Sequence, residues 1–166
     1  FDFVVFRIAY RCYAMEGRLN ADRNFESYYQ GAKAAGLDVG VYFFAQAITV
    51  EEAIEEADFV IELLKYHEIN GPVAYDWEMH DSSYRVYGTP PEMATACAIA
   101  FCERIKEAGY TPMIYAGQYV SYIKYDQGAI APYLSWYPEY KSESSEKQYP
   151  TFYYQMDYWQ FSSNCY

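Results

Sequence analysis

Asp76 and Glu78 stand one residue apart at the end of a short apolar run that begins at Gly71. Turn-forming residues bound the run, which is typical of a buried strand, and side chains two positions apart on a strand point to the same side. Two carboxylates held close together titrate at different pH values, so one can keep its proton near neutral pH while the other is charged. The pair can therefore provide a general acid beside an anionic group, as cleavage of a glycosidic bond requires. The simpler alternative is that both acids begin a solvated loop.

The composition limits the classes of function. A chain of 166 residues suits one domain with a sizeable core. Its net charge of −11 argues against nucleic acid or an anionic membrane as the main partner, since both are bound through clustered Lys and Arg. No apolar stretch approaches the length of a membrane span, and we expect that any secretion signal has been removed or was never present.

Metal and disulfide frameworks are not predicted. The only histidines are His67 and His80, and no ligand cluster of the zinc type is present, so we expect neither a metal nor a cofactor. The four cysteines are too few and too scattered for a disulfide scaffold, and we expect buried free thiols. They are Cys12, Cys97, Cys102 and Cys165.

Tyrosine is the most unusual component, because 22 Tyr accompany 10 Phe and 3 Trp. A tyrosine ring offers an apolar face and a hydroxyl group, which suits the C–H faces and hydroxyl rims of sugars. Most of these rings are nevertheless expected to pack in the core or on the surface. The aromatic content is therefore compatible with a carbohydrate ligand, but only the positions of the aromatic residues in the fold can indicate a binding site.

Apolar periodicity and turn residues divide the chain into alternating strands and helices. We predict a helix at 25–35 that ends at Gly36, a helix opened by a capping box of Thr49 and Glu52, and a helix opened by a second capping box at 89–92 and ended by Gly109. The alternation predicts βα units around a parallel sheet, open or closed into a barrel. Strands are predicted at residues 1–10, 39–44, 71–75, 111–115, 133–137 and 158–161.

In a barrel of this kind the chemistry lies at the carboxyl ends of the strands. Several aromatic residues and one arginine are predicted at those ends, around the two acids, which outlines a sugar-binding cleft. For each aromatic residue alone, packing in the core is an equal alternative. The candidate substrate-binding residues are Arg7, Tyr42, Phe44, Tyr115, Trp136 and Trp159.

These residues belong to six segments that resemble, in the same order, glycoside hydrolase family 25, the Chalaropsis-type lysozymes. The resemblance extends over almost the whole chain. Residues 3–7 are similar to the family's second strand, 22–44 to its D..F..N…GA..AGL.VGVYHF, 76–78 to its D-x-E, 101–115 to its FC…GY.P.IY, 136–140 to its LW.A.Y and 159–163 to its WQYSS.

The resemblance implies an α/β fold, a modified TIM-like (β/α) barrel, with residues 1–166 as a single glycoside-hydrolase catalytic domain that is incomplete in this chain. It implies a retaining muramidase that cleaves the β-1,4 bonds between N-acetylmuramic acid and N-acetylglucosamine in peptidoglycan. Glu78 would be the general acid, and Asp76 would assist by orienting the 2-acetamido group of the sugar as an internal nucleophile. It further implies a monomer that acts on peptidoglycan glycan strands, either secreted to the cell wall or released as a phage endolysin at lysis.

The sequence also departs from the family pattern. The family begins with an aspartate-bearing strand and continues past WQYSS to another acidic residue, and this chain has neither, so we expect a fragment of a longer domain. A degenerate, non-catalytic relative that binds cell-wall carbohydrate is the alternative. A barrel glycosidase that acts on another N-acetylated polymer, such as chitin, is a third hypothesis. Within the matched part, Phe43 replaces the histidine of YHF, and Pro138 falls inside LW.A.Y.

Overall fold

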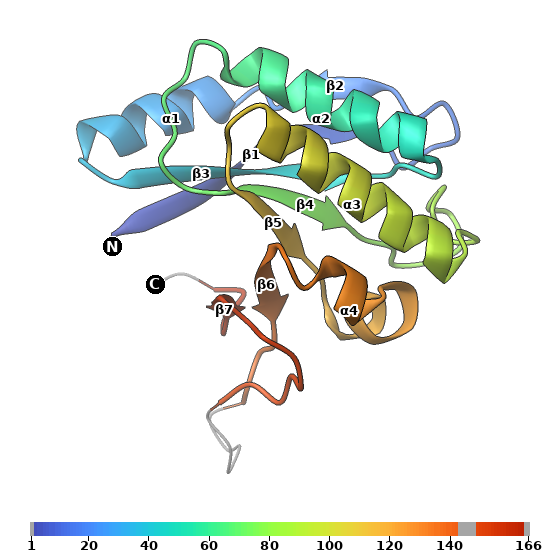
Figure 1. Ribbon diagram of the computed structural model, residues 1–166. Coiled ribbons are helices and arrows are strands. Elements are labelled where there is room, and N and C mark those ends of the chain that lie inside the picture. The colour runs from blue at the N-terminus through green and yellow to red at the C-terminus, as the bar shows by residue number, and fades with distance from the viewer. Residues whose placement is uncertain (1, 143–148, 165–166) are drawn as a thin grey trace.

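Seven strands form one sheet, in the order β2-β1-β3-β4-β5-β6-β7, in the computed structural model, which describes residues 2–142 and 149–164 (Figure 1). All neighbouring strands are parallel except β2, which is antiparallel to the end of β1. The strands are β1 (Phe3–Arg11), β2 (Leu19–Ala21), β3 (Asp38–Ala45), β4 (Val73–Trp77), β5 (Pro112–Tyr115), β6 (Leu134–Pro138) and β7 (Tyr158–Gln160). The helices are α1 (Phe25–Ala34), α2 (Val50–Leu64), α3 (Pro91–Glu107) and α4 (Gln127–Ile130), with a π-helical turn η1 (Val120–Lys124).

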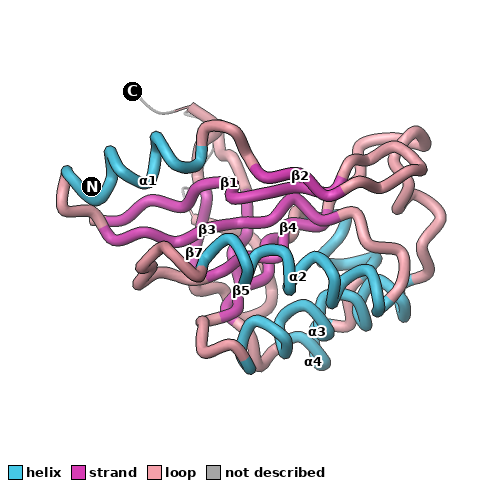
Figure 2. The backbone as a smooth tube through the Cα atoms, turned by 90° about the horizontal axis from the view of Figure 1, so that it is seen from above, coloured by secondary structure: helices cyan, strands magenta, loops and turns pink. Residues whose placement is uncertain are grey.

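The predicted α/β class is confirmed, and the predicted strands and long helices occur where expected, within a few residues at their ends. Helices α2 and α3 pack against each other and cover one face of the central strands (Figures 1 and 2). The other face of these strands is the concave, inner face of the curved sheet. Strand β4 lies at the centre of the sheet and is buried at all five positions, which explains why its sequence is almost continuously apolar.

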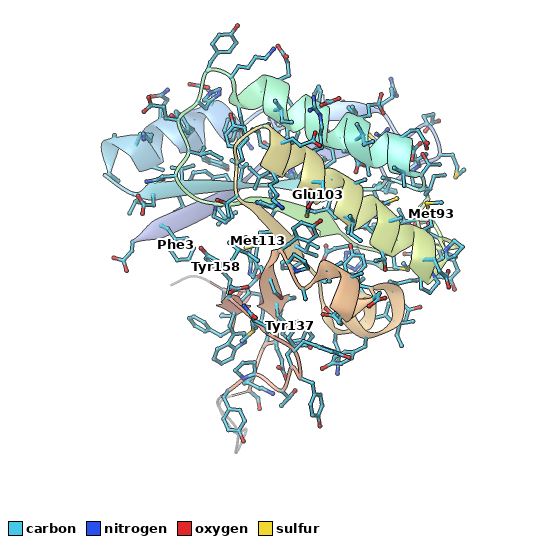
Figure 3. All side chains as sticks on the ribbon, viewed as in Figure 1. Phe3, Met93, Glu103, Met113, Tyr137 and Tyr158 are labelled. Atoms are coloured by element: carbon cyan, nitrogen blue, oxygen red, sulfur yellow. The ribbon has the colours of Figure 1, made fainter. Side chains whose placement is uncertain are left out.

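The sheet curves without closing into a barrel in the part of the chain that the structure describes. Its curvature nevertheless brings the first strand near the last, and the rings of Phe3 in β1 and Tyr158 in β7 meet edge to face at 5.6 Å between centroids (Figure 3). No backbone pairing joins these two described strands. The inside of the sheet is therefore a partly enclosed space, which agrees with the expectation of an incomplete barrel.

The regular alternation of strand and helix fails at both ends of the sheet. The connection between β1 and β3 contains the short antiparallel strand β2, and the connection between β5 and β6 contains only η1 and α4. Both features were missed because three to five residues are too few to show a period. Tertiary pairing stabilises them instead, as in the register of Ala9 opposite Ala21.

The two predicted capping boxes have different outcomes. Thr49 caps α2, since its Oγ1 accepts from the backbone N–H of Glu52 at 3.3 Å, but the Glu52 carboxylate accepts from the N–H of Ile48 at 2.8 Å rather than from Thr49. The capping box at 89–92 is wrong. Helix α3 begins at Pro91, and Pro90 is its N-cap, with no side-chain hydrogen bond. A residue that precedes proline avoids helical backbone angles, so the helix begins one residue later than the pattern predicts.

The predicted helix ends are confirmed. Gly36 follows α1 and Gly109 follows α3, with φ angles of +71° and +91°, a conformation that glycine adopts without steric penalty. No helix among residues 2–142 and 149–164 is long and apolar enough to cross a membrane.

The cysteine prediction is confirmed for two of the four residues. Cys97 and Cys102 are free thiols buried in α3, whereas Cys12 is free but only partly buried. Burial raises the pKa of Cys97 to about 12 and that of Cys102 well above its usual value. Cys165 lies outside the described residues.

The register of β3 and β4 depends on a close crossing of two glycines. The N–H of Gly71 donates to the carbonyl of Val39 at 2.9 Å, and a methyl group at Gly71 would lie 2.8 Å from the backbone nitrogen of Gly40. Only an unsubstituted residue permits this approach, and the resulting register sets Asp76 of β4 beside Phe44 of β3.

We therefore expect Gly71→Ala to lower the free energy of unfolding by about 1–3 kcal/mol, because the added methyl group meets backbone that cannot yield. Gly31→Ala is the matched control. Gly31 lies inside α1 with no atom within 4 Å of an added methyl group, so this change should stabilise the protein by about 0.5–1 kcal/mol. Urea denaturation measures both, and equal effects of the two substitutions would contradict the crossing as a constraint.

Candidate active site

Asp76 and Glu78 open into one pocket on the inside of the curved sheet, with a volume of about 380 Å³. Asp76 is the fourth residue of β4, and Glu78 follows the last residue of that strand. Trp77, between them, points to the helix-covered face, where its indole Nε1 donates to the carbonyl of Ala47 at 3.0 Å. The strand alternation predicted from sequence therefore brings both acids to one side. The pocket is lined by Val5, Tyr42, Asp76, Glu78, Tyr115, Trp136 and Gln160.

Three aromatic side chains form one wall of this pocket. The ring of Trp136 in β6 meets that of Tyr115 in β5 edge to face, with 4.9 Å between centroids, and that of Tyr42 in β3 at 6.4 Å. Tyr115 and Trp136 are direct neighbours in the strand register. The wall presents ring faces and edges together with tyrosine hydroxyl groups beside the two acids. Such a surface can bind the apolar face of a sugar ring and its hydroxyl rim.

The structure places three other predicted residues outside that lining. Phe44 is half-buried on β3 beside Asp76 in the register. Trp159 is turned away, and its indole Nε1 donates to the carbonyl of Glu139 at 2.9 Å. Side chains alternate along β7, so Gln160 faces the pocket in place of Trp159.

Arg7, the third of these residues, lies in an adjoining pocket of about 370 Å³, which shares Val5 and Tyr42 with the first. Its Nε donates to Oδ2 of Asp22 at 2.7 Å, and its guanidinium carbon lies 5.1 Å from the centre of the Tyr10 ring. Its side chain is 43% exposed, so the guanidinium remains accessible. A negatively charged group in the adjoining pocket can therefore approach Arg7.

Burial raises the pKa of both acids in the pocket. Asp76 has 7% of its surface exposed, and its pKa is raised well above the usual value, first by burial and then by the charge of Glu78, while Arg7 opposes the shift. Glu78 is less enclosed, with 28% of its side chain exposed, and burial raises its pKa while His80 lowers it. The His80 Nε2 lies 3.9 Å from the Glu78 Oε2. Burial therefore favours the protonated form of both acids, and the charge of Glu78 adds to this shift at the deeper Asp76.

Asp76 has a further property that bears on ligand binding. Its Oδ1 is buried, and no hydrogen-bond partner for it exists among the residues that the structure describes. An unpartnered buried carboxyl oxygen is unfavourable unless a ligand supplies the missing donor. Because this carboxyl group faces the pocket, a ligand with an N–H or O–H group can satisfy it.

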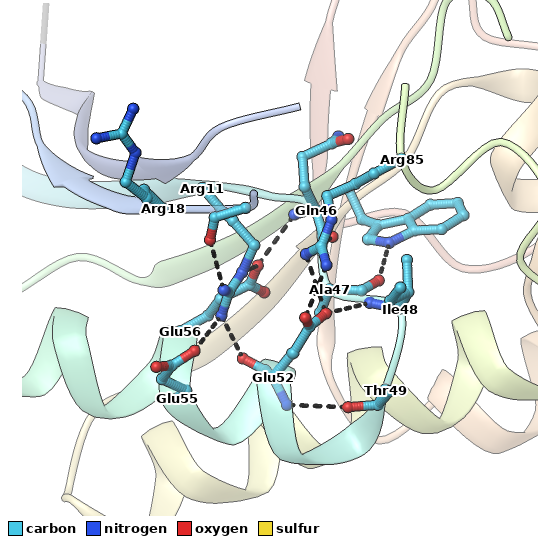
Figure 4. A network of polar contacts seen from close by, with 12 residues as sticks. Arg11, Arg18, Gln46, Ala47, Ile48, Thr49, Glu52, Glu55, Glu56 and Arg85 are labelled. Atoms are coloured by element: carbon cyan, nitrogen blue, oxygen red, sulfur yellow. Dashed lines mark hydrogen bonds and ion pairs between the residues drawn. The ribbon is translucent and has the colours of Figure 1, made fainter. Parts of the chain in front are cut away.

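A polar network lies behind the pocket, between α2 and the ends of β1 and β3 (Figure 4). Glu56 of α2 is fully buried, and its Oε1 accepts from the Nε of Arg11 at 2.8 Å and from the backbone N–H of Gln46 at 3.0 Å. Arg11 also donates to the backbone carbonyls of Gly17 at 2.8 Å and Glu52 at 3.1 Å. The two donors to Glu56, from Arg11 and from Gln46, offset much of the unfavourable burial of its charge.

Arg85, in the loop that follows β4, also binds to the segment between β3 and α2. Its two terminal nitrogens donate to the Glu52 carboxylate at 3.0 and 2.7 Å, and one of them also donates to the carbonyl of Gln46 at 3.0 Å. The Nε2 of Gln46 in turn donates to the backbone carbonyl of Glu78 at 2.7 Å. The network therefore reaches from α2 to the main chain of one of the two acids.

Sequence reasoning missed this network, although two signals for it are present. Gln46 is the only polar side chain in the run from 39 to 48 apart from Tyr42, and a lone polar residue in such a run has a buried partner to satisfy. Glu56 lies next to Ala57 on the apolar side of α2, between Ala53 and Val60, where a charge is unexpected.

A parallel sheet with two carboxyl groups and an aromatic wall at the carboxyl ends of its strands is the arrangement of a barrel-type glycoside hydrolase. The sequence profile of glycosyl hydrolases family 25 matches residues 9–166, and the chain belongs to this family. No curated protein matches the sequence.

Solved structures of low sequence identity share the fold. The modular autolysin LytC from Streptococcus pneumoniae has a TM-score of 0.77 and 21% identity over 99% of this chain and 37% of its own. The Clostridium perfringens spore cortex lytic enzyme SleM has a TM-score of 0.76 and 19% identity over 97% and 54%. The CTP1L endolysin has a TM-score of 0.72 and 18% identity over 98% and 52%. The chain thus spans about half or less of the length of these structures.

The buried network makes a prediction about pH. Burial raises the pKa of Glu56 from 4.5 to about 7, so the folded state binds this proton more tightly than the unfolded state does. The stabilising contribution of the proton is complete below pH 4.5 and is lost as the pH rises to about 7, by at most about 1.4 kcal/mol per pH unit. In Glu56→Gln this part of the pH dependence should disappear from urea unfolding measured between pH 4.5 and about 8.

Glu55→Gln is the matched control for this experiment. Glu55 also accepts from Arg11, at 2.7 Å, but its side chain is 60% exposed. This variant should keep the wild-type dependence of stability on pH. If Glu56→Gln and wild type show parallel curves, the assignment of this titration to Glu56 is wrong.

Proposed function

We propose that the chain is the catalytic part of a peptidoglycan hydrolase, a retaining muramidase that cleaves β-1,4 bonds between N-acetylmuramic acid and N-acetylglucosamine. The observation that carries the proposal is the pairing of a buried carboxyl group, Asp76, with a partly exposed one, Glu78, beside an aromatic wall in one pocket. Membership of glycosyl hydrolases family 25 supports the same reaction class.

Glu78 is the general acid in this proposal. It is the more exposed of the two acids, so it can reach the oxygen of the bond to be cleaved, and burial raises its pKa, which favours the protonated form that a general acid requires. As the bond between the sugar and the leaving oxygen breaks, the Glu78 proton moves to that oxygen. Positive charge then develops on the sugar that remains.

Asp76 helps to stabilise that positive charge by orienting the 2-acetamido group of the sugar. The amide N–H of this group can donate to Asp76, whose Oδ1 has no partner among the described residues, while the amide oxygen attacks the anomeric carbon. A hydrogen bond to the ionised carboxylate favours ionisation of Asp76. Binding of the sugar would therefore favour the ionised form of Asp76, and the charge of Asp76 would favour the protonated form of Glu78, which the reaction needs.

The remaining candidate residues bind the glycan strand. Tyr42, Tyr115 and Trp136 contact the sugar at the site of cleavage, and Phe44 contributes beside them on β3. Arg7 in the adjoining pocket binds a carboxylate of the substrate. Trp159 supports the site by fixing the carbonyl of Glu139.

Two neighbours in the structural comparison are described with ligands of this class. LytC was solved with a synthetic peptidoglycan ligand, and a mutant of the modular Cpl-1 endolysin, with a TM-score of 0.67, was solved with a tetrasaccharide-pentapeptide. By analogy we propose peptidoglycan glycan strands as the partner and a monomer that acts outside the cell, at the wall, or after release at lysis.

The first test is the loss of turbidity of Gram-positive cell walls. Glu78→Gln should reduce the rate by about 10²–10⁴-fold, because the proton donor is removed and the shape is kept. Asp81→Asn is the control, since Asp81 is a nearby but exposed acid and should retain wild-type activity. Wild-type lysis by Glu78→Gln would reject the acid assignment. Binding without lysis by the wild-type chain would favour the non-catalytic alternative, and cleavage of chitin oligomers but not peptidoglycan would favour the third hypothesis.

The second test concerns the alkaline side of the pH–rate profile. When Glu78 holds the proton, the Asp76 charge opposes its release, and Asp76→Asn removes that charge. The residual activity of Asp76→Asn should therefore fall at a lower pH than that of wild type, whereas Asp81→Asn should leave the alkaline limb in place. An unchanged limb in Asp76→Asn would mean that the two acids do not share a proton during the reaction.

A further inference from the structure

We infer that Gln46 is a positioning residue for Glu78: its buried side-chain amide holds the main chain from which the acid projects. The inference rests on the proposed role of Glu78 as general acid. It assigns a specific task to a residue that does not line the pocket.

The amide of Gln46 acts where the strand pairing stops. The register of β3 and β4 ends at the pair Ala45 and Trp77, so Glu78 is the first residue beyond the ladder. The Nε2 of Gln46 donates to the backbone carbonyl of Glu78 at 2.7 Å, and this bond replaces the backbone donor that another ladder step would have provided. The main chain of Glu78 is thereby fixed although it lies outside the strand.

Glu78 depends on this bond because its carboxyl group has little else to orient it. No hydrogen bond to that carboxyl group occurs among residues 2–142 and 149–164, and the Nε2 of His80 is 3.9 Å away from its Oε2. His80 itself has 64% of its side chain exposed. The position of the acid therefore depends on its backbone, since no hydrogen bond of its side chain fixes it.

Gln46 is suited to this task because it is itself immobile. Its side chain is fully buried, its N–H donates to Glu56 and its carbonyl accepts from Arg85, both at 3.0 Å. Next to it, the carbonyl of Ala47 accepts from the indole of Trp77. Gln46 and Ala47, which follow β3, are thus bonded to Glu78 and Trp77 at the end of β4, on the side away from the substrate.

The simpler alternative is that Gln46 only satisfies a buried carbonyl and contributes stability. The two roles differ in their effect on catalysis. The aromatic wall belongs to β3, β5 and β6, so loss of the Gln46 amide should leave substrate binding intact. A displacement of the acid by about 1 Å lowers the rate of the chemical step by up to about 10²-fold.

The experiment compares kcat and KM of the 166-residue chain on soluble peptidoglycan fragments. Gln46→Met keeps the length of the side chain and removes the donor, and it should lower kcat about 10–100-fold while KM changes less than about twofold. Gln127→Met is the control, because the Nε2 of Gln127 also donates to a backbone carbonyl, that of Ser121, at 2.7 Å, and neither of these residues lines the pocket of the two acids. It should lower the melting temperature and leave kcat unchanged.

Gln46→Glu provides a second variant in case Gln46→Met does not fold. A protonated carboxyl group can donate to the Glu78 carbonyl and an ionised one cannot, so its activity relative to wild type should rise as the pH falls. The inference is overturned if Gln46→Met reduces kcat no more than Gln127→Met, or if the Gln46→Glu ratio is independent of pH. Glu78→Gln is measured in parallel: if it is inactive, such a result rejects only the positioning role, whereas an active Glu78→Gln rejects the proposed function as well.

Discussion

The buried carboxylate of Glu56 is the interaction on which the active-site geometry depends. A carboxylate in the protein interior needs hydrogen-bond donors, and the Oε1 of Glu56 accepts from Arg11 of β1 and from the backbone of Gln46 beyond β3. These bonds tie helix α2 to one position on the sheet. They also hold the segment after β3, and the Gln46 amide in turn holds the start of the loop that carries Glu78. The need of the buried Glu56 carboxylate for hydrogen-bond donors thus helps to set the position of Glu78.

The molecule contains two kinds of buried acid, and their surroundings separate structure from chemistry. Burial raises the pKa of both Glu56 and Asp76, and each has one buried carboxyl oxygen without a partner among the described residues. Glu56, however, is ion-paired with Arg11, whereas Asp76 has no ion pair among these residues and faces a pocket. An acid that is paired contributes to a fixed arrangement. An acid that is left incomplete in a pocket is held in a state that a ligand can improve, and this is the physical basis for assigning chemistry to Asp76 and Glu78 rather than to Glu56.

Much of the fold and part of the site could be predicted from sequence. Apolar period, glycine caps and the spacing of Asp76 and Glu78 are local properties, and the structure agrees with them. The orientation of Trp159 was not accessible, because which face of a short strand turns inward depends on the register with its neighbour. The same holds for β2 and η1, which exist through tertiary contacts, and for Gln46, whose partner lies 32 residues away in sequence.

The two buried thiols of α3 are expected to react only slowly with oxidants and alkylating reagents. Only the thiolate form of cysteine reacts readily with oxidants and alkylating reagents, and a pKa of about 12 leaves roughly one Cys97 side chain in 100,000 ionised at pH 7. Cys102 is fully buried, and its pKa is raised as well. Both sulfur atoms serve as packing atoms of the core. The proposed catalytic groups are carboxyls, which do not undergo redox chemistry, so these two thiols and the two acids can keep the same covalent state in oxidising and reducing environments alike.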